Sequence, residues 1–167
     1  MPRSTAHLEN AASGTLSLTL IISLAAFVLY LIFQDWVTVP RFNEPHSGGI
    51  SLAKRTAISV GNVVPPLLLL ILVAMSPTTG PLPWLTVAWG TIYFVAFLVL
   101  AWLSWYQPYV SGTTPERAAS YEDEFASTIQ VLPPRGDHPR PNLAHVVLHL
   151  LMLLCLVLFI SRVTSGQ

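Results

Sequence analysis

The residues best suited to chemistry are two histidines in the C-terminal part of the chain. His145 and His149 stand four positions apart in an apolar segment, so a helix places both imidazoles on one face. Such a pair can bind a metal ion or flank a haem when further ligands come from elsewhere. The candidate metal ligands are His46, Asp137, His138, His145 and His149. The same pair can instead transfer a proton, bind a substrate or form hydrogen bonds within a helix bundle.

A second polar feature lies inside another apolar segment. Gly61-Asn62-Val63-Val64-Pro65-Pro66 places a carboxamide beside two prolines, which lack backbone donors and predict a helix kink. Asn62 can satisfy the freed carbonyls or line a small polar cavity. Because these side chains and two tryptophans fall at one end of their helices, we expect any site there. The candidate ligand-binding residues are Asn62, Trp102, Trp105, His145 and His149.

These residues require a scaffold of transmembrane helices. Nearly half of the chain lies in four apolar stretches without Asp, Glu, Lys or Arg: 15–33, 57–75, 84–106 and 143–161. A helix of about 20 apolar residues crosses the hydrocarbon of a bilayer. We therefore predict an all-α, polytopic membrane protein whose single domain is a four-transmembrane-helix bundle. The first stretch is longer than a signal-peptide core of about 7–15 residues, and we expect it to remain as a helix.

Composition supports this class. Hydrophobic residues make up 53% of the chain and charged residues 10%, whereas a typical soluble domain is about 25% charged. The net charge of zero provides no basic surface for nucleic acid. The single cysteine, Cys155, excludes an intramolecular disulfide and a thiolate zinc cage. The expected partners are the lipid bilayer and a membrane protein or second copy of the chain, with no nucleic acid.

The basic residues predict an orientation. Four spans put both termini and the 76–83 link on one side, and the loops 34–56 and 107–142 on the other. The first side carries two basic residues and the second carries six: Arg3 and Arg162 against Arg41, Lys54, Arg55, Arg117, Arg135 and Arg140. Cytoplasmic loops are enriched in Lys and Arg. We therefore predict a protein of the cell membrane with cytoplasmic long loops and both termini outside.

The 107–142 loop contains one further predicted helix. Thr114-Pro115-Glu116 combines a hydroxyl cap, a proline and an acid, as at many helix starts. Apolar residues then recur every three or four positions: Ala118, Tyr121, Phe125, Ile129 and Leu132. We predict a short amphipathic interfacial helix over about 115–131, on the membrane surface or over the bundle mouth. Asn142 is the expected N-cap of the last span, and residues 1–14 are expected to be poorly ordered.

Three functions fit this pattern. The scarcity of ionisable residues in the spans favours a scaffold, an accessory subunit, or a module that binds lipid or a small ligand through the long-loop face. The alternative is a small redox or lipid-modifying membrane enzyme that uses His138, His145 and His149. A second alternative is a component of an oligomeric transporter or channel, although no span carries the carboxylate expected of a cation relay.

Overall fold

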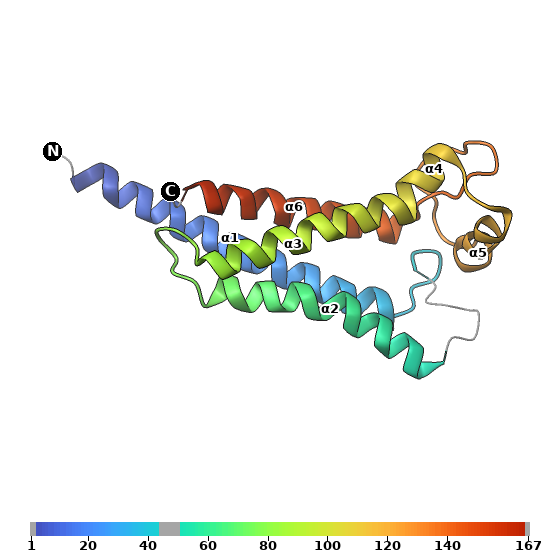
Figure 1. Ribbon diagram of the computed structural model, residues 1–167, viewed down its shortest axis with the longest axis horizontal. Coiled ribbons are helices and arrows are strands. Elements are labelled where there is room, and N and C mark those ends of the chain that lie inside the picture. The colour runs from blue at the N-terminus through green and yellow to red at the C-terminus, as the bar shows by residue number, and fades with distance from the viewer. Residues whose placement is uncertain (1–2, 44–50, 166–167) are drawn as a thin grey trace.

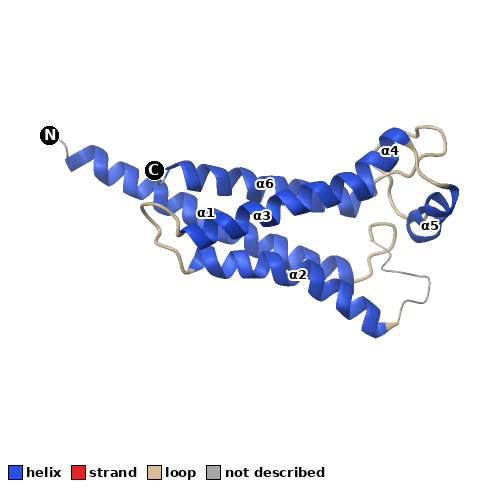
Figure 2. Cartoon of the chain, in the orientation of Figure 1, coloured by secondary structure: helices blue, strands red, loops and turns tan. Residues whose placement is uncertain are grey.

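The computed structural model describes residues 3–43 and 51–165, and in this part of the chain every regular element is a helix (Figures 1 and 2). Four helical segments are long and apolar enough to cross a membrane: Asn10–Trp36, Leu52–Ala74, Trp84–Ser111 and Leu143–Ser165. The bundle is elongated, with both ends of the chain at one end and the long loops at the other (Figure 1). The predicted all-helical bundle with four candidate spans is confirmed.

The first helix is longer than the sequence predicts. Helix α1 spans Arg3–Trp36, so residues 3–14 continue the helix of the first span. The Ser13 and Ser17 hydroxyls both donate to the carbonyl of Thr78, at 3.2 and 3.0 Å. These bonds attach the first part of α1 to the 76–83 link and supply a tertiary reason for its order.

The second and last spans begin where their cap residues stand. Helix α2, Leu52–Ala74, starts after Ser51, whose hydroxyl accepts the Lys54 amide N–H at 3.3 Å. Helix α6, Leu143–Ser165, starts after Asn142, whose Oδ1 accepts the His145 amide N–H at 3.0 Å. Each cap satisfies one of the orphan donors of a helix N-terminus, and the predicted cap at Asn142 is confirmed.

The third span runs past its predicted end at residue 106. Helix α3, Trp84–Ala101, continues through a π-helical turn, η1, at Trp102–Tyr106, into α4, Gln107–Ser111. A proline in the first turn of a helix needs no backbone donor, which allows α4 to include Pro108. The loop therefore starts at Gly112, where φ of +79° ends the helix.

The predicted helix over 115–131 is shorter than expected. Helix α5 spans Pro115–Phe125 and begins at the predicted cap, where Thr114 Oγ1 accepts the Arg117 N–H at 3.4 Å. It ends early because the next side chains bind its last carbonyl. Thr128 Oγ1 and Gln130 Nε2 both donate to Phe125 O, at 2.6 and 2.8 Å.

The core of the bundle consists of aliphatic and aromatic side chains from all four long segments. Phe27, Phe94, Met152 and Phe159 are each at most 3% exposed. Gly90 permits the close approach of α3 to α6, because a Cβ there would overlap the Phe159 ring. That ring packs on Phe94 with centroids 5.5 Å apart, so it has little room to move.

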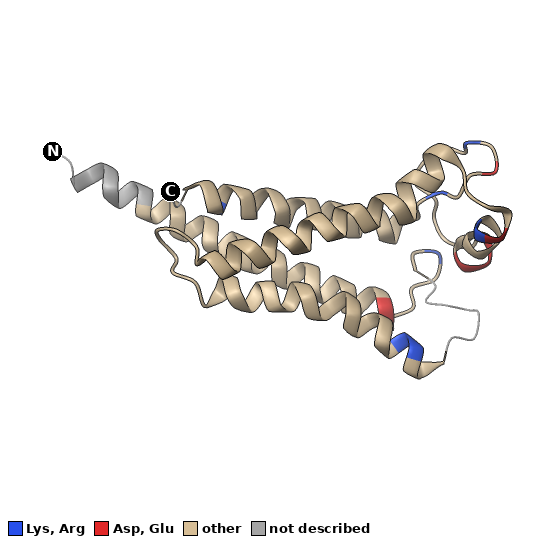
Figure 3. Ribbon diagram, in the orientation of Figure 1, with Lys and Arg blue, Asp and Glu red and all other residues tan. Residues whose placement is uncertain are grey.

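The end of the bundle that carries the termini is closed by a buried arginine. Arg162 is fully buried, and its guanidinium donates to Ser17 Oγ, Gly80 O and Pro77 O at 2.7–2.8 Å. These bonds join α6 to α1 and to the link between α2 and α3. Among the described charged side chains, only Arg162 lies at this end (Figure 3). Its positive charge is therefore buried inside the protein and is not exposed at the surface.

The contact between α3 and α6 yields a prediction about stability. Gly90→Ala is expected to lower the free energy of unfolding by about 1–3 kcal/mol, because overpacking forces the Phe159 ring to shift. Gly61→Ala is the matched control, since a Cβ at Gly61 meets no atom within 4 Å. The two unfolding midpoints in detergent provide the measurement. Equal midpoints would show that the close packing is absent.

Candidate functional site

The third span carries a π-helical turn just before Pro108. The proline has no backbone N–H, so the carbonyl of Ser104 lacks its α-helical donor. The amide of Gln107 bonds to Trp102 O, five residues back, and thereby leaves the Leu103 carbonyl without its usual partner as well. π-Turns occur frequently at functional sites, and this one presents two free carbonyls to the loop side of the bundle.

Helix α5 binds these two carbonyls. The Tyr121 hydroxyl donates to Ser104 O, and the Arg117 guanidinium donates to Leu103 O at 2.9 Å. The Tyr121 ring also meets the Trp105 ring edge-on, with centroids 5.2 Å apart. Helix α5 is therefore attached to the end of the third span by hydrogen bonds and by aromatic packing, and its apolar side chains rest on the bundle.

His145 is held by neighbours on several sides. Its Nδ1 lies 2.7 Å from Asn142 Oδ1 and its Nε2 lies 3.5 Å from Gln34 Nε2. Since an amide oxygen accepts and an amide nitrogen donates, these partners select the Nδ1–H tautomer. The imidazole packs against Trp105 at a centroid distance of 3.8 Å and against the edge of Phe125 at 5.5 Å. The ring therefore has a fixed orientation.

The loops around Asn142 position that residue. Asn142 is 1% exposed, and Gln130 pairs with it in an isolated antiparallel bridge. The next amide, Leu143 N–H, donates to Ile129 O at 2.8 Å, and the Ile129 N–H donates to Arg41 O at 2.7 Å. The two long loops are thus linked through backbone hydrogen bonds beside the start of α6.

His149 lies one turn further along α6 and is 5% exposed. A hydrogen bond of 2.9 Å joins its Nδ1 to the hydroxyl of Tyr106, the last residue of the π-turn. Phe97 packs edge-on against its ring at 6.1 Å. The rings of His145 and His149 have centroids 6.4 Å apart, so the predicted arrangement on one helix face is confirmed.

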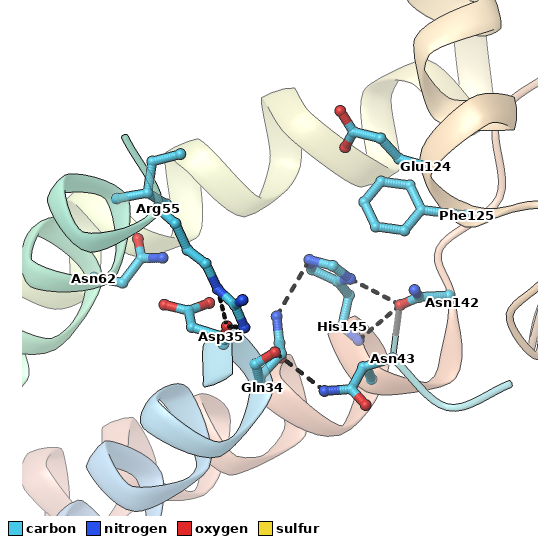
Figure 4. Close-up of a pocket in the computed structure, with 11 residues that line it drawn as sticks. Gln34, Asp35, Asn43, Arg55, Asn62, Glu124, Phe125, Asn142 and His145 are labelled. Atoms are coloured by element: carbon cyan, nitrogen blue, oxygen red, sulfur yellow. Dashed lines mark hydrogen bonds between the residues drawn. The ribbon is translucent and has the colours of Figure 1, made fainter. Parts of the chain in front are cut away.

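A polar pocket of about 230 Å³ lies beneath the long loops, and we call it the mouth chamber (Figure 4). Its lining residues are Gln34, Asp35, Asn43, Arg55, Ile58, Asn62, Glu124, Phe125, Asn142, Ala144 and His145. Arg55 extends from α2 to the Asp35 carbonyl, to which Nε donates at 2.8 Å, and its guanidinium lies 4.9 Å from the ring centre of Trp36. The chamber thus combines charges of both signs.

A larger pocket of about 400 Å³ adjoins the mouth chamber on its bundle side, and we call it the inner chamber. Its lining residues are Leu31, Gln34, Gly61, Asn62, Pro65, Trp89, Ile92, Tyr93, Ala96, Phe97, Leu100, Ala101, Ser104, Trp105, His145, Leu148 and His149. None of these residues is Asp, Glu, Lys or Arg. Gln34, Asn62 and His145 line both chambers, so the two spaces lie side by side.

Several polar groups in residues that line the inner chamber lack partners within the described part of the chain. Tyr93, 8% exposed, has no hydrogen-bond partner for its hydroxyl, and Gln34 has none for Oε1. The Asn62 carboxamide is exposed and forms no hydrogen bond to another described residue. Buried polar groups are normally paired. The Tyr93 hydroxyl and Gln34 Oε1, together with the exposed Asn62 carboxamide, therefore give this chamber hydrogen-bonding groups from three helices that a ligand can bind.

The proposed metal ligands are not assembled into one cluster within the described residues. His138 and Asp137 line a separate pocket of about 110 Å³ beside α5, and His138 Nδ1 bonds to Tyr109 O at 2.8 Å. His46 lies outside the described residues. The described part of the chain holds no group of three or more His, Cys, Asp or Glu residues arranged to bind a metal. The chambers therefore contain the two histidines of α6 but not His138.

Four of the five candidate ligand-binding residues line the inner chamber: Asn62, Trp105, His145 and His149. Trp102 is 52% exposed and lines neither chamber. Gln34 and Tyr93 also line the inner chamber, although neither is among the candidates predicted from the sequence. Gln34 carried a usable signal, because it is a polar residue directly after an uninterrupted apolar stretch. Tyr93 carried none, because an aromatic residue in an apolar helix is typical of any core.

The contacts of His145 predict its tautomer. We expect ¹⁵N NMR of histidine-labelled protein in lipid to show the Nδ1–H form, because Asn142 Oδ1 accepts that proton. Asn142→Ala removes the acceptor and should shift the population toward Nε2–H. His138, which bonds to Tyr109 O instead, should keep its spectrum and serves as the internal control. An Nε2–H form of His145 in the unmodified protein would contradict the hydrogen-bond network.

Comparison of the chain with protein-family models, with curated proteins and with solved structures returned no match. The structural basis for a function is therefore the pair of chambers. Their geometry combines a charged opening beneath loops with a neutral, ring-lined space between helices.

Proposed function

We propose that the chain is a multi-pass protein of the cell membrane that binds a lipid-like ligand through its long-loop face. The observation that carries this proposal is that a charged chamber and an uncharged, mainly apolar chamber lie side by side and share Gln34, Asn62 and His145 in their linings. A ligand with one polar end and one apolar part matches such a pair of spaces. A purely water-soluble ligand would leave the inner chamber unused.

The position of the inner chamber supports access from the bilayer. Residues of α2 and α3 form much of its lining, and these helices diverge toward the long-loop end (Figure 1). On α3, the lining residues Ile92 and Leu100 are each 63% exposed, so the chamber reaches the outer surface of the bundle. In a membrane this surface faces lipid, and an apolar ligand can enter sideways.

Charge distribution supports the proposed orientation. Among the charged residues whose side chains the structure describes, all except Arg162 gather at the long-loop end (Figure 3). Because Arg162 is buried and bonded to carbonyls, its charge is not displayed at the surface of the opposite end. We therefore place the long loops and α5 in the cytoplasm, with α5 at the interface over the chamber mouth.

The alternatives receive less support from the same geometry. An enzyme built on three histidines would need His138 near His145 and His149, yet His138 lines a different pocket. A transporter would need a path to the other end, where Arg162 joins α6, α1 and the link between α2 and α3. Binding therefore remains the function that the chambers support best.

Photo-crosslinking tests this proposal. A long-chain alcohol that carries a diazirine should label the protein in lipid nanodiscs in a saturable manner, with the label on peptides of α2 and α3. Ala96→Phe places a ring into the inner chamber, because Ala96 lines it. Labelling at low probe concentration should fall by about ten-fold or more, as expected when about 1.4 kcal/mol or more of binding energy is lost.

The matched control is Val95→Phe, on the neighbouring position of the same helix. Val95 is 56% exposed and does not line the chamber, so the added ring faces lipid and labelling should remain unchanged. Labelling that never saturates, or that falls equally in both variants, would contradict a binding site in the inner chamber.

A further inference from the structure

The lining of the inner chamber restricts the charge of its ligand. None of its residues is Asp, Glu, Lys or Arg, and a charged group placed there would lose its water without gaining a counter-ion. Such burial is strongly unfavourable. A phosphate, carboxylate or ammonium group would therefore remain in the mouth chamber, where Arg55, Asp35 and Glu124 are available. The part of the ligand inside the inner chamber is uncharged.

The unpaired polar groups of the chamber indicate which hydrogen-bonding groups the uncharged part of the ligand must carry. A tyrosine hydroxyl such as that of Tyr93 can donate, Gln34 Oε1 can only accept, and the Asn62 carboxamide can do both. These residues come from α3, α1 and α2 and line the same chamber. The complementary ligand carries oxygen atoms that accept hydrogen bonds or hydroxyl groups that donate them. A plain acyl chain offers neither.

Ring side chains suggest the shape of the ligand. Ring side chains recur every four residues along α3 and line the chamber: Trp89, Tyr93 and Phe97. The rings of Trp105 and His149 also belong to its lining. Aromatic rings pack well against the face or edge of another flat ring. The volume of about 400 Å³ lies within the usual range of small-ligand pockets, about 300–1,000 Å³.

We propose that the inner chamber binds the ring of an isoprenoid quinone or its quinol, an inference that rests on the proposed lipid-binding function. The ring is flat, uncharged and soluble in the bilayer. The two quinone carbonyls accept from Asn62 and Tyr93, a quinol hydroxyl donates to Gln34 Oε1, and the isoprenoid tail leaves between α2 and α3 past Ile92. The proposal concerns binding and assigns no electron transfer.

Competition against the diazirine alcohol tests the ligand class. Decylubiquinone should abolish labelling of the nanodisc-embedded protein at a concentration at least about ten-fold lower than dioctanoylglycerol, which also is uncharged but has no ring. Asn62→Leu and Tyr93→Phe should each raise the half-competing concentration of decylubiquinone about five-fold, the effect of losing one hydrogen bond. Both variants should keep the unfolding midpoint of the parent protein.

Thr91→Val is the matched control, because Thr91 is an exposed residue of α3 that bonds to Val87 O and does not line the chamber. It should leave competition unchanged. Saturable labelling that both competitors displace equally would overturn the quinone assignment and leave lipid binding standing. Absence of saturable labelling would overturn both. An unchanged half-competing concentration in both Asn62→Leu and Tyr93→Phe would also overturn the quinone assignment.

Discussion

The arrangement of this protein depends on how polar groups find partners inside an apolar bundle. In hydrocarbon a backbone carbonyl or side-chain amide has no water to bind, so each must be satisfied by another part of the protein. Pro108 and the π-turn before it leave two such carbonyls at the end of the third span, those of Ser104 and Leu103, and α5 supplies the donors that bind them. The position of α5 over the bundle therefore follows from this irregular turn.

The same requirement acts in opposite ways at the two ends of the bundle. At the end that carries the termini, Arg162 donates to two backbone carbonyls and a serine, and this network closes the space between α1, α6 and the short link. At the other end, α2 and α3 separate, and α5 lies beyond the ends of these helices (Figure 1). Gln34 and Asn62 at that end, and Tyr93 deeper in the third span, line the inner chamber with groups that have no hydrogen-bond partner among the described residues. These groups are available to a ligand.

Much of the scaffold was predictable, because long apolar stretches and cap residues act locally. The four spans, Thr114 as the start of α5 and Asn142 as the start of α6 all depend on neighbours within a few residues. The boundaries that failed depend on distant contacts. Helix α5 stops at Phe125 because Gln130 and Thr128 bind its last carbonyl, and residues 129–131 pair with other loops.

The site was predictable only in part. His145, His149, Asn62 and Trp105 stood out because polar and aromatic residues in spans are conspicuous, and they line one chamber. The separation of His138 from them follows from the path of the 126–142 segment, which no local pattern determines. Tyr93 and Arg162 were missed for a related reason. Their importance lies in the presence or absence of partners far away in the sequence, and spacing alone does not reveal such partners.

The central claim is that a space inside the bundle connects the polar mouth to the lipid-facing side between α2 and α3. Nitroxide accessibility at Gly61 tests it most directly, in a Cys155→Ala background and with the protein in nanodiscs. A Cβ at Gly61 meets open space, about 14 Å along α2 from its start. We expect a spin label at Gly61 to collide with both a water-soluble nickel chelate and dissolved oxygen. A label at Val64, which is 51% exposed and lines neither chamber, should collide with oxygen alone. Identical behaviour at the two positions, with no nickel collision at Gly61, would contradict a connected chamber.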